Sequence, residues 1–140
     1  MKFFKIISLY ILTILLFCSC GLLKEKGTFR DKLDEIQAIK IVKLGTFNQE
    51  TVLFDEEELA NCSDLDAIKN ELLQLPFHSI WNDPYELQEG EVVFKIIYNN
   101  GDFDLIGASA QWKYRAEKWH YGYTIFDKQK FEQLIAKYVA

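Results

Sequence analysis

The stretch EVVFKIIYNNGDFDLIGA, residues 91–108, decides the fold of this protein. Two apolar runs flank Asn100-Gly101, and Asn-Gly is the preferred pair for a two-residue type I′ hairpin turn. A two-residue loop pairs Tyr98 with Phe103 in two antiparallel strands. One face of the sheet then carries Phe94, Ile96, Tyr98, Phe103 and Leu105. The opposite face carries Lys95, Ile97, Asp104 and Ile106, so we expect one core face and one mixed face.

The sequence after this hairpin predicts a further strand and a terminal helix. Residues 119–126, WHYGYTIF, are typical of a strand, and residues 111–114, QWKY, either extend the preceding strand or bend away from it. Asp127 is a good N-cap for a helix over residues 128–139. The apolar stripe of that helix contains Phe131, Leu134, Ile135 and Tyr138.

The sequence before the hairpin predicts two strands and a helix. Residues 36–44 alternate β-branched side chains with lysines and end at Gly45, and residues 50–54 are the expected hairpin partner. The acidic run 55–58 is expected to form a solvated turn. Ser63 is the expected cap of a helix over residues 64–75, whose stripe contains Leu65, Ile68, Leu72 and Leu75.

This order of elements predicts a small α+β domain over residues 29–140. An antiparallel sheet of about five strands would pack against two or more helices, one of them C-terminal. Residues 29–36 are expected to form a short helical lead-in. The length of 140 residues, with 49% hydrophobic and 26% charged residues, fits one globular core.

The N-terminal segment has the pattern of a secretory signal. Residues 1–5, MKFFK, are basic, and residues 6–17, IISLYILTILLF, form an uncharged apolar run. The sequence Phe17-Cys18-Ser19-Cys20-Gly21 resembles the lipobox of bacterial lipoproteins, with a bulky residue at −3, a small residue at −1 and then a cysteine. Phe17 departs from the leucine usual at −3. The resemblance covers residues 1–21 only.

The resemblance implies that Cys20 is lipidated and becomes the mature N-terminus. Residues 1–19 would then be a signal peptide and residues 20–28 a tether, with the domain attached to a membrane outside the cytoplasm. Several acyl chains on one cysteine give stable anchoring, which one chain alone does not. The alternative is an uncleaved transmembrane helix, because the apolar stretch through Leu23 is about long enough to cross a bilayer.

Composition excludes some classes of function. The formal net charge is −5 without a cluster of Lys or Arg, so nucleic acid is not an expected partner. Cys62 is the cysteine left after cleavage and lipidation, so no internal disulfide is expected. At a helix start its thiol pKa could be lowered, although a small apolar filler is the favoured interpretation.

The sequence offers little for catalysis. His78 and His120 are the two histidines, and neither lies in a metal-ligand motif, so no metal site and no cofactor are predicted. No serine-nucleophile elbow or phosphate-binding glycine loop is present. We therefore expect no enzymatic activity, with a small hydrolase that uses His78 or His120 as a minor alternative.

The aromatic residues are the candidate ligand-binding set. Trp119, Tyr121 and Tyr123 alternate along one expected strand, Trp112 precedes it, and Trp81 lies in the connection over residues 77–90. Aromatic faces with polar neighbours suit a groove for a glycan or an extended peptide, and they equally suit a core beneath the C-terminal helix.

The sequence therefore predicts a membrane-anchored envelope lipoprotein with a non-catalytic binding or structural domain. Its partner would be an envelope protein or a cell-wall glycan or peptide. An alternative is an inhibitor or immunity-type protein whose acidic surface complements a basic partner.

Overall fold

The structure, a computed structural model, describes residues 29–79, 86–108, 110–122 and 124–140. The chain divides into two compact units, residues 1–31 and 32–140. The predicted signal peptide, tether and lipobox fall outside the described residues. In the first unit only residues 29–31 are described, at the start of the 3₁₀ helix η1 (Phe29–Glu35), where a helical lead-in is expected. The remaining description concerns the second unit.

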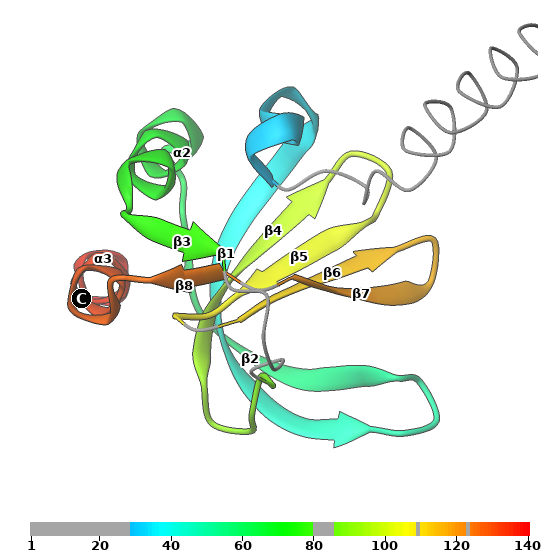
Figure 1. Cartoon of the computed structure of the whole chain (residues 1–140). Coiled ribbons are helices and arrows are strands. Elements are labelled where there is room, and N and C mark those ends of the chain that lie inside the picture. Colours follow the sequence, from blue (N-terminus) through cyan, green and yellow to red (C-terminus); the bar gives the residue numbers. More distant parts are fainter. Residues whose placement is uncertain (1–28, 80–85, 109, 123) are drawn as a thin grey trace, which may run out of the picture. The chain divides into compact units, whose positions relative to one another are not determined.

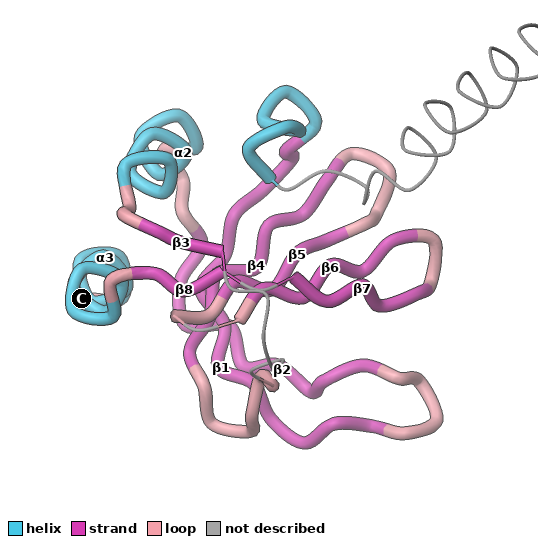
Figure 2. The backbone as a smooth tube through the Cα atoms, in the orientation of Figure 1, coloured by secondary structure: helices cyan, strands magenta, loops and turns pink. Residues whose placement is uncertain are grey.

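The second unit is an α+β domain, as predicted (Figure 1). In its described part, six strands form one antiparallel sheet in the order β2-β1-β4-β5-β6-β7, and β3 pairs with β8 in a separate two-stranded sheet. The strands are β1 (Ile36–Asn48), β2 (Leu53–Asn61), β3 (Phe77–Ser79), β4 (Val92–Tyr98), β5 (Phe103–Ile106), β6 (Gln111–Arg115), β7 (Lys118–Gly122) and β8 (Thr124–Phe126). The helices of the domain are α2 (Leu65–Gln74) and α3 (Lys128–Val139), shown in cyan in Figure 2.

The β4–β5 hairpin exists as predicted, but its loop is one residue longer. The backbone N–H of Tyr98 donates to the carbonyl of Asp102 at 2.9 Å, which leaves residues 99–101 as a three-residue loop. Gly101 closes this loop with φ +87°, a conformation that glycine adopts without strain. A three-residue loop ending in a left-handed glycine is the next most common hairpin connection after the two-residue turns.

The extra loop residue shifts the register and changes which side chains share a face. Ile97 pairs with Phe103 and Ile96 with Asp104, so the predicted faces of β5 are wrong. Because side chains alternate along a strand, a shift of one residue moves every side chain of β5 to the other face. Asp104 therefore lies on the face of Ile96 and Tyr98.

The β1–β2 hairpin is longer than predicted. The acidic residues 55–58 lie within β2 and do not form a turn. Gly45 lies inside β1 at an irregularity of the pairing, where a Cβ atom would stand 3.1 Å from Asp55 Cβ. The two strands approach each other closely here, so a larger residue would have to push them apart by a few tenths of an ångström. Charged side chains along β2 also protect an edge strand from pairing with other chains.

The predicted strand over residues 119–126 is two strands in two different sheets. β7 ends at Gly122 and β8 begins at Thr124. QWKY belongs to a strand of its own, β6, which is joined to β7 by Ala116 and Glu117. Both of these residues have positive φ, as a type I′ turn requires.

The helices have the predicted stripes, with one change of cap. Asp127 caps α3 and accepts a hydrogen bond from the backbone N–H of Lys130. Asp64, not Ser63, caps α2 by accepting from the N–H of Ala67 at 3.0 Å. The carboxylate of Asp64 reaches this N–H from the residue directly before the helix, and an acidic side chain also suits the helix dipole there.

Apolar side chains are buried on both faces of the main sheet. Helix α3 packs on β1, β2 and β4, and its Phe131 meets Phe94 of β4 edge to face at 5.5 Å. The buried residues on this helix-covered face include Ile39, Ile41, Ile68, Leu72, Phe94, Ile96, Ile106 and Phe131. The opposite face holds a second cluster, formed by Val42, Leu44, Leu87, Val93, Phe103, Leu105 and Ala110.

The sheet curls around this second cluster. The indole Nε1 of Trp119 on β7 donates to the carbonyl of Val52, just before β2, at 2.6 Å. Phe54 of β2 lies 5.7 Å from Trp112 of β6, measured between ring centroids. The β1–β2 hairpin therefore contacts β6 and β7 across this face, which we call the concave face. In Figure 1 the β1–β2 and β6–β7 hairpins extend on the same side of the domain.

Candidate functional site

The predicted aromatic residues that the structure describes gather on the concave face. Trp112 pairs with Tyr121 across β6 and β7, and Tyr114 pairs with Trp119. Trp112 and Trp119 are half-buried and pack against the second cluster, while Tyr121 is 47% exposed. Trp81 and Tyr123 lie outside the described residues. The predicted core beneath the C-terminal helix is wrong for the described rings, because they pack on the face of the sheet opposite α3. A ligand groove on this face stays a prediction.

Two phenylalanines that the sequence interpretation missed extend this aromatic set. Phe47 of β1 meets Phe54 of β2 at 4.9 Å, and Phe54 meets Trp112 at 5.7 Å. Trp112 in turn meets Tyr121 at 4.8 Å. Each distance joins two ring centroids, so four rings form one continuous row. Phe47 and Phe54 face each other across the β1–β2 hairpin, and only the curl of the sheet brings them to β6 and β7.

The row of rings borders an open pocket of about 440 Å³, which we call the aromatic pocket. This volume lies within the range of small-molecule sites. Glu86 and Glu89 also line this pocket, and both residues are exposed. Phe47 and Tyr121 are also exposed. The described lining consists of Phe47, Phe54, Glu86, Leu87, Gln88, Glu89, Trp112 and Tyr121.

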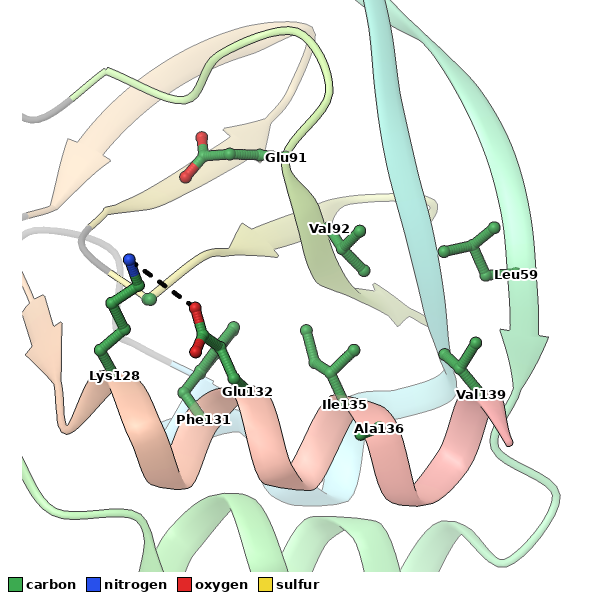
Figure 3. A pocket seen from close by; sticks show the side chains of 10 residues that line it. Leu59, Glu91, Val92, Lys128, Phe131, Glu132, Ile135, Ala136 and Val139 are labelled. Atoms are coloured by element: carbon green, nitrogen blue, oxygen red, sulfur yellow. Dashed lines mark ion pairs between the residues drawn. The ribbon is translucent and has the colours of Figure 1, made fainter.

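A second pocket, of about 530 Å³, lies between α3 and the sheet (Figure 3). Its walls are mainly aliphatic, with Leu59 and Val139 at one end in this view. At the other end, Lys128 forms an ion pair with Glu132 at 3.7 Å, and Glu91 lies nearby. The described lining is Leu59, Glu91, Val92, Ala108, Lys128, Phe131, Glu132, Ile135, Ala136 and Val139. The ion pair partly balances the charge, so this pocket offers apolar contact and little chemical selectivity.

A buried polar network lies on the helix-covered face of β4, β5 and β6. Asp104 is fully buried, and its Oδ1 lies 2.6 Å from Nη2 of Arg115, which is also buried. The other carboxylate oxygen accepts hydrogen bonds from the hydroxyl of Tyr98 at 2.7 Å and from the amide of Gln111 at 3.4 Å. Arg115 also donates to the carbonyl of Phe103 at 3.1 Å. Oδ2 of Asp104 and Nη1 of Arg115 thus have hydrogen-bond partners, and Oδ1 and Nη2 contact each other as an ion pair. Nε of Arg115 is buried without a hydrogen-bond partner among the described residues.

Burial controls the acid–base behaviour of this network. It raises the pKa of Asp104 above the ordinary carboxyl value, although Arg115 and the Tyr98 hydroxyl act in the opposite direction. Burial and the neighbouring Asp104 also raise the pKa of Tyr98 far above its usual value. Because Asp104 and Arg115 are out of reach of solvent, we assign the network a structural role.

Cys62 and His120 do not belong to the described lining of the aromatic pocket. Burial, with a smaller contribution from Glu71, raises the pKa of the Cys62 thiol to about 11, which agrees with the apolar-filler interpretation. His120 is exposed on β7, whereas His78 belongs to β3 of the other sheet. Among the described residues, no group of His, Cys, Asp and Glu is arranged to hold a metal ion.

The predicted lipidation site, Cys20, lies outside the described residues. Within the described ranges, no helix has the length and apolar character needed to span a membrane. Comparisons of the chain with protein-family models, curated proteins and solved structures give no match.

Proposed function

We propose that this protein is a lipoprotein of the bacterial cell envelope, anchored to a membrane through Cys20. Its α+β domain acts as a non-catalytic binding module, and the aromatic pocket is its ligand site. The observation that carries this proposal is the continuous row of Phe47, Phe54, Trp112 and Tyr121 beside an open pocket. The lipobox-like sequence supports the anchor.

Exposure of the rings favours a binding role over a purely structural one. Phe47 and Tyr121 are 37% and 47% exposed, although their ring neighbours Phe54 and Trp112 pack against a well-formed apolar cluster. Rings that only stabilise the core gain nothing from contact with water, whereas rings at a ligand site become buried when the ligand binds. Glu86, Gln88 and Glu89 add hydrogen-bonding groups at the same border.

The inhibitor alternative depends on a strongly acidic surface, and β2 is the obvious candidate for it. Its acidic side chains are partly neutralised, because Glu56 pairs with Lys95 and Glu58 pairs with Lys40, each at 2.6 Å. An ion pair on the same sheet weakens the field that such a surface presents to a basic partner. The aromatic pocket is therefore the better-supported site.

Two measurements test the proposal. The first is the mass of the N-terminal peptide of the protein isolated from its native membrane, with Cys20→Ala as control. We expect it to begin at an acylated Cys20, and an unmodified peptide that begins at Met1 would reject the anchor.

The second measurement is a titration of tryptophan fluorescence with solubilised cell-wall fragments. Trp112 borders the pocket, so binding should change its emission. Tyr121→Leu should abolish the change, while Tyr138→Leu, on α3 outside the pocket lining, should leave it intact. Identical titrations of the two variants would reject the aromatic pocket as the site.

A further inference from the structure

The geometry of the rings in the aromatic pocket limits the kind of ligand it can take. Phe47 and Phe54 stand at 69° to each other, and Trp112 and Tyr121 stand at 83°. A sugar ring prefers a flat platform on which its broad face can stack, whereas rings at steep angles make the walls of a corner. A corner of aromatic walls fits a compact, rounded group, as in the aromatic cages that hold ammonium ligands.

The charge at the pocket adds a second constraint. Glu86 and Glu89 border it, and no Lys, Arg or His occurs in its described lining. The face of an aromatic ring carries negative electrostatic potential, so the rings and the two carboxylates all favour a positive ligand. An anionic ligand would meet repulsion from both carboxylates, and a neutral ligand would gain nothing from their charge.

We infer that the aromatic pocket binds a small organic cation through an alkylammonium group. This inference rests on the proposed binding function and specifies its ligand. The ammonium group lies in the corner made by Trp112 and Tyr121, and Glu86 and Glu89 neutralise its charge from the border. The pocket volume of about 440 Å³ exceeds that of an ammonium group alone, which leaves room for the rest of the ligand.

The test compares cations with neutral molecules of the same shape. The full chain is purified in a nonionic polyoxyethylene detergent, which carries neither a sugar nor a charge. Choline and its neutral carbon isostere 3,3-dimethylbutan-1-ol are titrated by calorimetry, together with tetramethylammonium and butylammonium. We expect at least one of the cations to bind, and choline to bind about twofold to fivefold more tightly than its isostere, the size of an exposed cation–π contact.

Variants separate the contributions of charge and rings. The double variant Glu86→Gln/Glu89→Gln keeps the shape of the border and should weaken binding of the cations by about threefold to tenfold, with a smaller dependence on salt. Glu57→Gln, an exposed glutamate of β2 outside the pocket lining, removes the same kind of charge and serves as control. Tyr121→Leu should also weaken binding, because it removes a wall and keeps an apolar side chain.

The outcomes distinguish this inference from the proposed function. Equal affinity for choline and its isostere, or no binding of any of the three cations at about 10 mM, would overturn the inference. If cell-wall fragments still bind in that case, the binding module stands with a neutral ligand. If cell-wall fragments also fail to bind, the proposed function falls as well.

Discussion

Replacement of Arg115 by methionine should destabilise the domain strongly, because it leaves the carboxylate of Asp104 buried without a counter-ion. Both side chains are buried, with exposures of 1% and 0%, and the charged atoms lie 2.6 Å apart. Removing one partner of a buried pair costs about 3–5 kcal/mol. A domain of ordinary stability, about 5–15 kcal/mol, would lose a large part of its free energy of unfolding.

An exposed ion pair of the same length supplies the control. Lys40 and Glu58 are also 2.6 Å apart, but their side chains are 31% and 48% exposed. Lys40→Met should cost about 1 kcal/mol or less, because water already screens that pair. The assay is urea unfolding followed by tryptophan fluorescence. Equal losses of unfolding free energy in Arg115→Met and Lys40→Met would refute the argument that burial of an ion pair determines how strongly its removal destabilises the domain.

The pH dependence provides a second check on the same reasoning. Burial raises the pKa of Asp104 in the folded state, and removal of Arg115 should raise this pKa further. A raised carboxyl pKa means that the folded state binds the proton more tightly than the unfolded state. The loss of unfolding free energy in Arg115→Met should therefore be smallest at low pH, where Asp104 is protonated in both folded proteins. It should grow as pH rises from the pKa of Asp104 in the unchanged folded protein to its higher pKa in the variant, and then level off. A loss of unfolding free energy that does not change with pH would contradict an uncompensated charge on Asp104.

The double variant Asp104→Asn/Arg115→Met completes the test. It removes both charges and keeps an acceptor for the hydroxyl of Tyr98, which donates to Asp104 at 2.7 Å. We expect it to be more stable than Arg115→Met at pH 7, since no unpaired charge is buried. A double variant that is less stable than the single variant would show that lost packing and hydrogen bonds, and not charge, dominate.

Three further predictions concern other parts of the domain. Burial raises the pKa of Cys62 to about 11 from an ordinary 9.0, so at pH 8 alkylation of the native thiol should be about a hundredfold slower than in urea-unfolded protein, and equal rates would contradict this. Gly45→Ala should lower the free energy of unfolding by about 1–3 kcal/mol, because its Cβ would stand 3.1 Å from Cβ and 3.2 Å from the carbonyl oxygen of Asp55. Gly107→Ala, whose Cβ would stand 3.0 Å from a methyl group of Leu87 and 3.6 Å from side-chain atoms of Glu91 and Val93, should cost less in the same urea titration, because it meets side chains and no backbone atom. Glu117→Gly should stabilise the domain by about 1 kcal/mol, because Glu117 has φ +62°, and an unchanged or lower urea midpoint would refute a strained turn.

Local patterns in the sequence predicted most of the elements. The stripe and the cap of α3 are as expected from residues 127–139, and the β4–β5 hairpin is where Asn100-Gly101 indicates a turn. The error in register arose where a single residue decides the outcome. The loop of that hairpin has three residues instead of two, and both types of loop tolerate the same Asn-Gly pair.

The candidate site was predictable only in part, for a related reason. Alternation along one strand identified Trp119 and Tyr121, and their neighbour Trp112 belongs to the same row of rings. Phe47 and Phe54 lie more than fifty residues before Trp112 in the sequence. The sequence of their hairpin does not predict which other strands its loop end contacts. Their contact with Trp112 depends on the curl of the whole sheet.

The sequence by itself determined the α+β class, the two helices and the strands of the central hairpin, because these follow from periodicity and turn chemistry over a few residues. It also contains the lipobox-like segment on which the proposed membrane anchor rests. Only the tertiary structure decided that Asp104 is buried against Arg115 and that Phe47 and Phe54 join Trp112 and Tyr121 around one pocket. Strand register and sheet curvature are set by contacts between residues that are distant in the sequence. A local sequence pattern does not predict those contacts.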